Sequence, residues 1–163
     1  MFIYSVRAST VKFLGFILLT LALLVGAAIV TNDNTVLAAS AGATVDFGGI
    51  KENSDRVKFI EQFGIDVDDE AIEEKSFKMP DSFDRVILGY NELQKKQGLD
   101  LSKYAKKRVT RYTYKVNNFD SDGAVYANLF VYRNKIVACD ISSADPEGFV
   151  LPLTLVEKKQ LTK

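Results

Sequence analysis

The chain has 163 residues, with 21 basic and 21 acidic side chains, one cysteine and no histidine. The lack of histidine excludes Ser-His-Asp and Cys-His catalysis, a histidine general base and the usual zinc sites. A single cysteine, Cys139, excludes an intrachain disulfide, so the core must hold the fold, and we expect Cys139 to be buried in a strand. The balanced charge argues against a nucleic acid partner, because nucleic-acid binders need a basic surface.

An uncharged run at residues 13–30 (FLGFILLTLALLVGAAIV) contains 12 Leu, Ile, Val or Phe among its 18 residues. A helix of that length reaches roughly 27 Å, close to the hydrocarbon thickness of a bilayer. Arg7 and Lys12 precede the run, and no other basic residue appears before Lys51. The positive-inside rule therefore predicts a signal anchor in the cell membrane, with residues 1–12 in the cytoplasm and the rest of the chain outside. A cleaved signal peptide is the alternative, although its apolar region is usually only ~7–15 residues long.

The remainder of the chain divides by composition into three parts. Residues 31–47 are small and polar without a sustained period, which predicts a tether. Residues 48–155 are predicted to form one extracytoplasmic domain, long enough to bury a core. Residues 156–163 are predicted to be a charged tail.

Helical spacing dominates the first half of this domain. Val57, Ile60 and Phe63 recur before Gly64, which predicts a helix over 54–63. A second and stronger pattern, which predicts a helix that ends before Gly98, consists of Phe83, Val86, Ile87, Tyr90 and Leu93. Between the two helices, residues 74–79 alternate weakly and end at a proline, as an edge strand does.

From about residue 106 the hydrophobic period changes to two. Alternation over 108–116, 124–132 and 135–142 predicts three strands, with Arg133-Asn134 as a two-residue turn between the last two. Residues 145–163 are expected to be a loop that packs through Phe149, Val150 and Leu151. The whole predicts an α+β domain, with two helices on one face of an antiparallel sheet that comprises the three-strand meander (106–142) and one edge strand.

The predicted turn fixes which residues share a face of the sheet. Val131 should oppose Ile136, and Leu129 should oppose Ala138. The face beneath the helices would then carry Val125, Ala127, Leu129, Val131, Ile136 and Ala138. The other face would carry Tyr126, Asn128, Phe130, Tyr132, Val137, Cys139 and Ile141, with Arg111, Thr113 and Lys115 from the first strand of the meander.

This second face is too apolar to be exposed to solvent without a function. It is either covered by the segment 149–153 or exposed as an aromatic and partly basic interaction surface. In the second case the candidate binding residues are Tyr126, Phe130, Tyr132, Arg111 and Lys115.

Basic residues concentrate just before and within the first strand of the meander. They are Lys95, Lys96, Lys103, Lys106, Lys107, Arg108, Arg111 and Lys115. Such a run is usually a solvated surface. The alternative is a basic patch, centred on Lys103, Lys106, Lys107 and Arg108, that binds anionic wall polymer or lipid headgroups.

A short acidic loop has the beginning of a calcium motif. Asn118, Asp120 and Asp122 alternate before Gly123, as the first ligands of such a loop do. No acidic residue follows until Asp140, so the bidentate carboxylate is missing. A hairpin turn is therefore favoured and calcium is the alternative, and we expect no other metal and no cofactor.

Several segments resemble a known family. They are Phe59-Ile-Glu-Gln-Phe-Gly64, Tyr90-Asn-Glu-Leu-Gln-Lys-Lys-Gln-Gly98, Asp100-Leu-Ser-Lys-Tyr104, Arg111-Tyr-Thr-Tyr-Lys-Val116 and Ala127-Asn-Leu-Phe-Val-Tyr132. Over about residues 57–153 the chain is similar to domain-of-unknown-function family 4830, found in membrane-anchored proteins of Gram-positive, mostly clostridial, bacteria. The resemblance implies an anchored extracytoplasmic domain and supplies no activity, substrate or catalytic residue.

The motifs of common enzymes are absent from the sequence, which has no nucleophile elbow, phosphate loop or metal cluster. We therefore expect a non-catalytic binding domain at the bacterial cell envelope. Its partner would be an envelope protein, a peptide or an anionic wall polymer. An envelope hydrolase or other enzyme with an unrecognised site is one alternative, and a calcium-binding module that uses the 118–123 loop is another.

Overall fold

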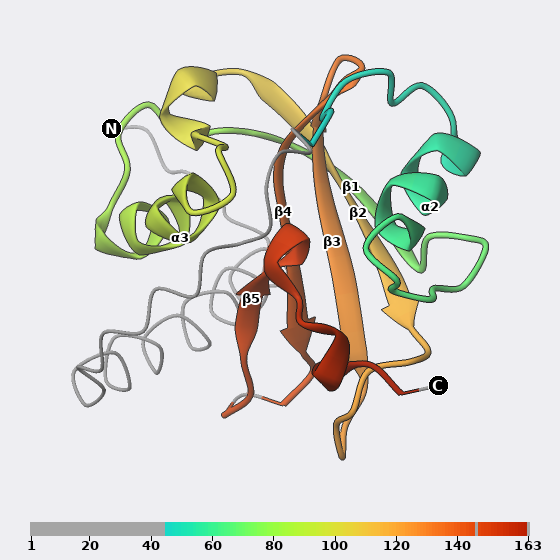
Figure 1. Cartoon of the computed structure of the whole chain (residues 1–163). Helices are drawn as coiled ribbons and strands as arrows, with labels where there is room; N and C mark the ends of the chain where they lie inside the picture. The colour runs from blue at the N-terminus through green and yellow to red at the C-terminus, as the bar shows by residue number, and fades with distance from the viewer. Residues whose placement is uncertain (1–44, 146, 163) are drawn as a thin grey trace.

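The computed structural model describes residues 45–145 and 147–162, which form a five-stranded antiparallel sheet with helices packed against it (Figure 1). The strands follow one another in the sheet in chain order: β1 (Glu73–Lys78), β2 (Arg108–Val116), β3 (Val125–Tyr132), β4 (Lys135–Ser143) and β5 (Val150–Pro152). The α-helices are α2 (Asn53–Glu61) and α3 (Arg85–Lys95), and the short 3-10 helices are η1 (Leu101–Tyr104), η2 (Leu153–Leu155) and η3 (Lys158–Gln160). The predicted α+β class, meander and edge strand are confirmed.

The predicted membrane anchor lies outside the described residues. Residues 1–12, 13–30 and 31–44 all precede them. Within the part of the chain that the structure describes, no helix is both long enough and apolar enough to cross a membrane.

The turn between β3 and β4 is the predicted two-residue turn. Tyr132 opposes Lys135 and Val131 opposes Ile136. Arg133, the first turn residue, has a φ of 56°. A positive φ at this position is typical of the tight turns whose twist matches a hairpin.

The predicted register is wrong beyond this turn, because β4 contains one extra residue. Leu129 opposes Cys139 rather than Ala138, and Val137 is the extra residue of a β-bulge beside Val131. A shift of one residue moves each following side chain to the opposite face. The face of Leu129 therefore carries Cys139 and Ile141, whereas the other face carries Val137 and Ala138.

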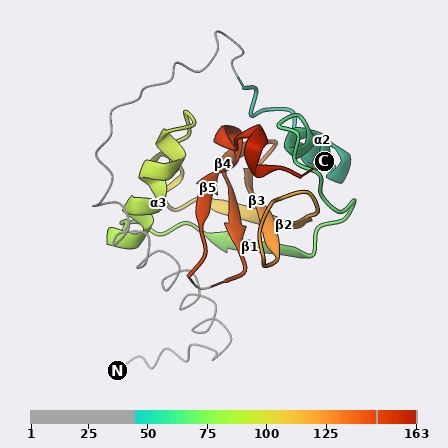
Figure 2. The ribbon, with the colours of Figure 1, turned by 60° about the horizontal axis from the view of Figure 1, so that its bottom comes forward.

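The two helices cover opposite faces of the sheet, and not one face as the sequence analysis predicted. α2 packs Phe59 and Ile60 onto the face that carries Leu129. α3 packs Tyr90 against Phe130, with 5.9 Å between the ring centroids. Neighbouring residues of a strand point to opposite faces, so α2 and α3 lie on either side of the sheet, as Figure 2 also shows. Each sheet face is apolar enough to need its own cover.

The fold extends beyond the predicted domain bounds of 48–155 at both ends. Val45 and Phe47, assigned above to the tether, pack against the core on the α2 side. Val156 and Leu161, assigned to the tail, pack against the same core. The spacing of these apolar residues shows no helix or strand period, so the sequence did not predict that they pack against the core.

The predicted loop around residue 150 contains β5. Val150 opposes Ser142, and Pro152 opposes Asp140. Three residues are too few for a recognisable alternation, and a proline is tolerated at the edge of a sheet. Phe149, just before β5, stacks on Phe119 at 5.0 Å between centroids.

α3 buries two amide side chains more deeply than the apolar stripe that predicted it, although Tyr90 of that stripe packs against the core. Its two buried residues are Asn91 and Gln94, while Val86, Ile87 and Leu93 are only half-buried. Apolar spacing located the helix correctly, but it did not indicate that Asn91 and Gln94 are its most deeply buried residues.

Two glutamines form hydrogen bonds with the backbone of β4 at Cys139, just before the residues that pair with β5. Gln94 Oε1 accepts a hydrogen bond from the backbone N–H of Cys139 at 2.9 Å, and Gln97 Nε2 donates to the carbonyl of Cys139 at 2.6 Å. Gln97 Oε1 also accepts from the N–H and the hydroxyl of Thr154, at 3.2 and 3.0 Å. Side chains thus satisfy backbone groups that would otherwise be buried without partners.

This arrangement predicts a large effect of Gln97→Ala on stability. The change removes the partners of the Cys139 carbonyl and the Thr154 N–H, and each buried unsatisfied group costs about 1–3 kcal/mol. We expect the free energy of unfolding, measured with urea, to fall by about 2–3 kcal/mol. Lys96→Ala, an exposed change one residue earlier, is the control and should change it little. Equal changes in the unfolding free energy of the two variants would contradict the assignment of Gln97 as a partner of buried backbone.

Candidate functional site

Seven exposed cations gather at one end of the sheet, where β1 and β3 end and β2 and β4 begin. We call this the basic end, and it consists of Lys78, Lys103, Lys106, Lys107, Arg108, Arg133 and Lys135. It lies at the top of Figure 1, with the β3–β4 hairpin and η1. A cluster in which cations outnumber anions attracts a negatively charged partner.

The antiparallel topology assembles this site from distant segments. Lys78 opposes Arg108 across β1 and β2, and Lys135 follows the turn that contains Arg133. In the sequence, only the four cations between 103 and 108 stand close together as a run. The other three could be identified from their positions at strand ends, because in an antiparallel meander the end of one strand lies beside the start of the next.

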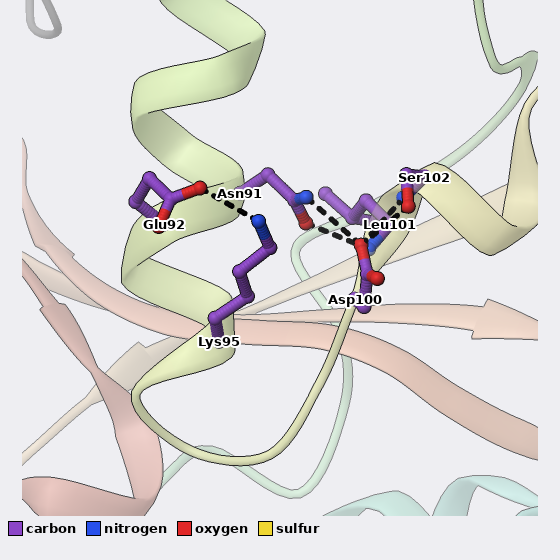
Figure 3. A network of polar contacts seen from close by, with 6 residues as sticks. All are labelled: Asn91, Glu92, Lys95, Asp100, Leu101 and Ser102. Atoms are coloured by element: carbon purple, nitrogen blue, oxygen red, sulfur yellow. Dashed lines mark hydrogen bonds and ion pairs between the residues drawn. The ribbon is translucent and has the colours of Figure 1, made fainter.

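Asp100 holds η1, which carries Lys103, against α3 (Figure 3). One carboxylate oxygen of Asp100 accepts from Asn91 Nδ2 at 2.9 Å, and from the N–H and hydroxyl of Ser102 at 3.0 and 2.7 Å. Asn91 Oδ1 accepts in turn from the N–H of Leu101 at 2.7 Å. The hydrogen bond from Asn91, followed by that from Ser102, lowers the pKa of Asp100 to about 2. The carboxylate is thus ionised, and one of its oxygens positions η1.

Two cations of the basic end occupy left-handed backbone. Among the described residues, Lys106 (φ 63°) and Arg133 (φ 56°) are the non-glycine residues with positive φ. This conformation costs an L-residue roughly 1–2 kcal/mol, a cost that glycine avoids. Lys106 Nζ pairs with Asp81 at 2.8 Å, and the Arg133 guanidinium lies 5.3 Å from the centre of the Tyr132 ring. Charged side chains therefore stand at both positions that favour glycine.

The opposite end of the sheet is acidic. We call this the acidic end, and it consists of the exposed residues Asp66, Asp68, Asp69, Glu70, Asp120, Asp122, Asp145 and Glu147. Backbone bonds from Asp68 to Lys115 and from Ala144 to Ala124 place these loops beside the end of β2 and the start of β3. Lys115, Lys158 and Lys159 only partly offset their charge. The domain is thus charged oppositely at the two ends of its strands.

Most of the predicted aromatic surface is covered by α3 and η1. The Phe130 ring contacts Phe77 and Tyr90, at 6.1 and 5.9 Å between centroids, and Tyr132 contacts Tyr104 at 5.6 Å. The alternative cover, the segment 149–153, places Leu153 in the core on the other side of the sheet. The prediction that this segment covers the aromatic face is therefore wrong, because α3 covers that face instead.

The remaining residues predicted for that surface are separated. Tyr126 is half-buried and opposes the exposed Lys115. Arg111 is largely buried and forms an ion pair with Glu73 on β1. The five predicted residues therefore do not form one open surface.

The predicted calcium ligands do not converge. The Asn118 side chain donates to the carbonyl of Gly64 at 2.9 Å and accepts from the N–H of Asp66 at 2.8 Å, so it clamps two loops together. Asp120 and Asp122 are exposed. Over residues 45–145 and 147–162, no group of three or more His, Cys, Asp or Glu side chains is placed to hold a metal ion.

A buried polar network that the sequence analysis missed lies beneath α3. Asp140 accepts hydrogen bonds from the Tyr90 hydroxyl at 2.6 Å and from Asn128 Nδ2 at 2.8 Å, and Asn128 Oδ1 accepts from Thr113 at 2.9 Å. Burial raises the pKa of Asp140 to about 6, although both hydrogen bonds oppose this effect. The available signal was a lone carboxylate in an otherwise apolar strand. Only 4% of Asp140 is exposed, so it docks α3 on the sheet rather than meeting a substrate.

A family model described as "Domain of unknown function (DUF4830)" matches residues 59–141. The match extends from α2 to β4 and includes all seven residues of the basic end. No curated protein and no solved structure matches the chain.

The Asp140 network predicts a specific dependence of stability on pH. Burial raises the pKa of the Asp140 carboxyl from its ordinary value of 3.8 to about 6, so between these pH values the folded protein binds more protons than the unfolded chain. The unfolding free energy of the wild type should therefore fall, relative to that of Asp140→Asn, as pH rises from about 4 to about 7. Urea titrations of both proteins measure this difference. A difference that is constant or grows with pH would refute the assignment.

Proposed function

The chain belongs to the family DUF4830, a domain of unknown function, and we propose that it is a non-catalytic binding domain whose basic end contacts an anionic partner at the cell envelope. The observation that carries this proposal is the collection of seven exposed cations at one end of the sheet. Two of them occupy backbone positions that glycine would fill at lower cost. Strain of this kind is typical of functional positions.

We further propose that residues 13–30 anchor the chain in the membrane, with the N-terminus inside and the folded domain outside. The apolar run and the basic residues before it support this topology. In this setting the polyanions within reach are wall polymers, acidic peptides or proteins, and lipid headgroups.

Polyanion binding by the full chain in detergent tests the function. We expect it to bind poly(glycerol phosphate) at low salt and to release it at ~1 M salt, where exposed charges are screened. The triple variant Lys103→Glu, Lys107→Glu, Arg108→Glu should lose at least about tenfold in affinity, because a cluster acts as a unit. The control Lys96→Glu, Lys115→Glu, Lys158→Glu changes net charge equally outside the basic end. Equal losses in the two variants, or binding that survives high salt, would overturn the proposal.

Protease accessibility tests the topology. Protease added to intact, wall-stripped cells should digest the folded domain and spare residues 1–30, because the bilayer shields only what lies within or behind it. An immunoblot with tags at both ends of the chain measures this. Protection of the domain until the cells are lysed would contradict the extracytoplasmic location.

A further inference from the structure

We propose that the basic end docks onto the anionic headgroups of the same membrane that anchors the chain, so that the strands stand upright and the acidic end points away. This inference rests on the proposed function, because it needs both the membrane anchor and an anion-binding basic end. It names the partner as a bilayer surface rather than a wall polymer or a protein.

The path of the chain into the domain supports this orientation. The Phe47 carbonyl accepts from the N–H of Ile136 at 2.8 Å, and the Ile50 N–H donates to the carbonyl of Asn134 at 3.0 Å. The first described residues therefore run along the start of β4 towards the β3–β4 turn (Figure 1). The first described residues thus lie beside the first residues of β4, which begins at the basic end.

The length of the intervening chain keeps this end close to the bilayer. Between the predicted anchor and residue 45 lie 14 residues of small and polar composition. A segment of that length can span at most about 50 Å. The tether therefore presents headgroups to the domain at a high local concentration, which a freely diffusing partner lacks.

The charge of the two ends then selects one orientation. Each Lys or Arg near an anionic bilayer is worth roughly a fivefold increase in partitioning, and the attraction decays over about 8–10 Å at physiological salt. β2 has nine residues, so its two ends are roughly 26–30 Å apart. The carboxylates of the acidic end consequently lie beyond the range of the surface when the basic end touches it, and they do not cancel its attraction.

Two tyrosines that join η1 to β3 lie beside the cations of the basic end, and their partly exposed rings are suited to an interface. Tyr104 and Tyr132 are half-buried and pack against each other at 5.6 Å between centroids. Tyrosine combines an apolar ring with a polar hydroxyl, and it is enriched where membrane meets water. An aromatic pair among cations fits a headgroup layer better than it fits a fully hydrated polymer.

Energy transfer in lipid nanodiscs tests the orientation with the full chain. A donor dye is attached at Ser82→Cys, exposed beside Asp81 at the basic end, or at Ser121→Cys, exposed in the acidic end. Cys139 is fully buried and should not be labelled. Headgroup acceptors are placed in discs of phosphatidylcholine, with or without phosphatidylglycerol.

We expect more transfer from Ser82→Cys than from Ser121→Cys in discs that contain phosphatidylglycerol. This difference should disappear in neutral discs, in ~1 M salt, and in the variant Lys103→Glu, Lys107→Glu, Arg108→Glu. Equal energy transfer from the two sites in anionic discs would overturn the inference. A difference in transfer that is the same in anionic and neutral discs would also overturn it. If poly(glycerol phosphate) still binds in detergent, that result leaves the proposed function standing; if it does not, both fall.

Discussion

One extra residue in β4, Val137, determines how the two layers of the domain are assembled. The bulge that it creates turns Cys139 towards α2 and Asp140 towards α3. It lies just before the stretch of β4 that β5 pairs, so the backbone of Cys139, which β5 does not pair, is available to Gln94 and Gln97. The position of α3, and with it the position of η1 in the basic end, follows from this single change of register.

The sequence predicts the strands better than it predicts their faces. The meander and the turn at Arg133 were recoverable because alternation and turn residues are local signals. The bulge was not, because residues 136–139 are all apolar and a shift of one position leaves no trace in the pattern. The burial of Gln94, in α3, and of Gln97, just after it, was missed for a related reason, since both score as polar although their amides satisfy buried backbone.

The candidate site shows the same division between local and distant signals. The run from Lys103 to Arg108 is visible in the sequence, but Lys78 and Arg133 join it only through strand pairing. The aromatic residues that alternate along β3 looked available for binding, yet α3 and η1 use Phe130 and Tyr132 to dock. Apolar periodicity therefore indicated packing, and the charges left at the strand ends indicate the functional surface.

The central claim is that one end of the sheet, and not the other, meets an anion. Amide chemical shifts of the isotope-labelled full chain in nanodiscs test it most directly, because they report contact residue by residue. When phosphatidylglycerol replaces phosphatidylcholine, the account predicts shifts at 78, 103–108 and 132–135, and none at 66–70 or 120–122. Shifts confined to the acidic end, or spread evenly over the domain, would contradict it.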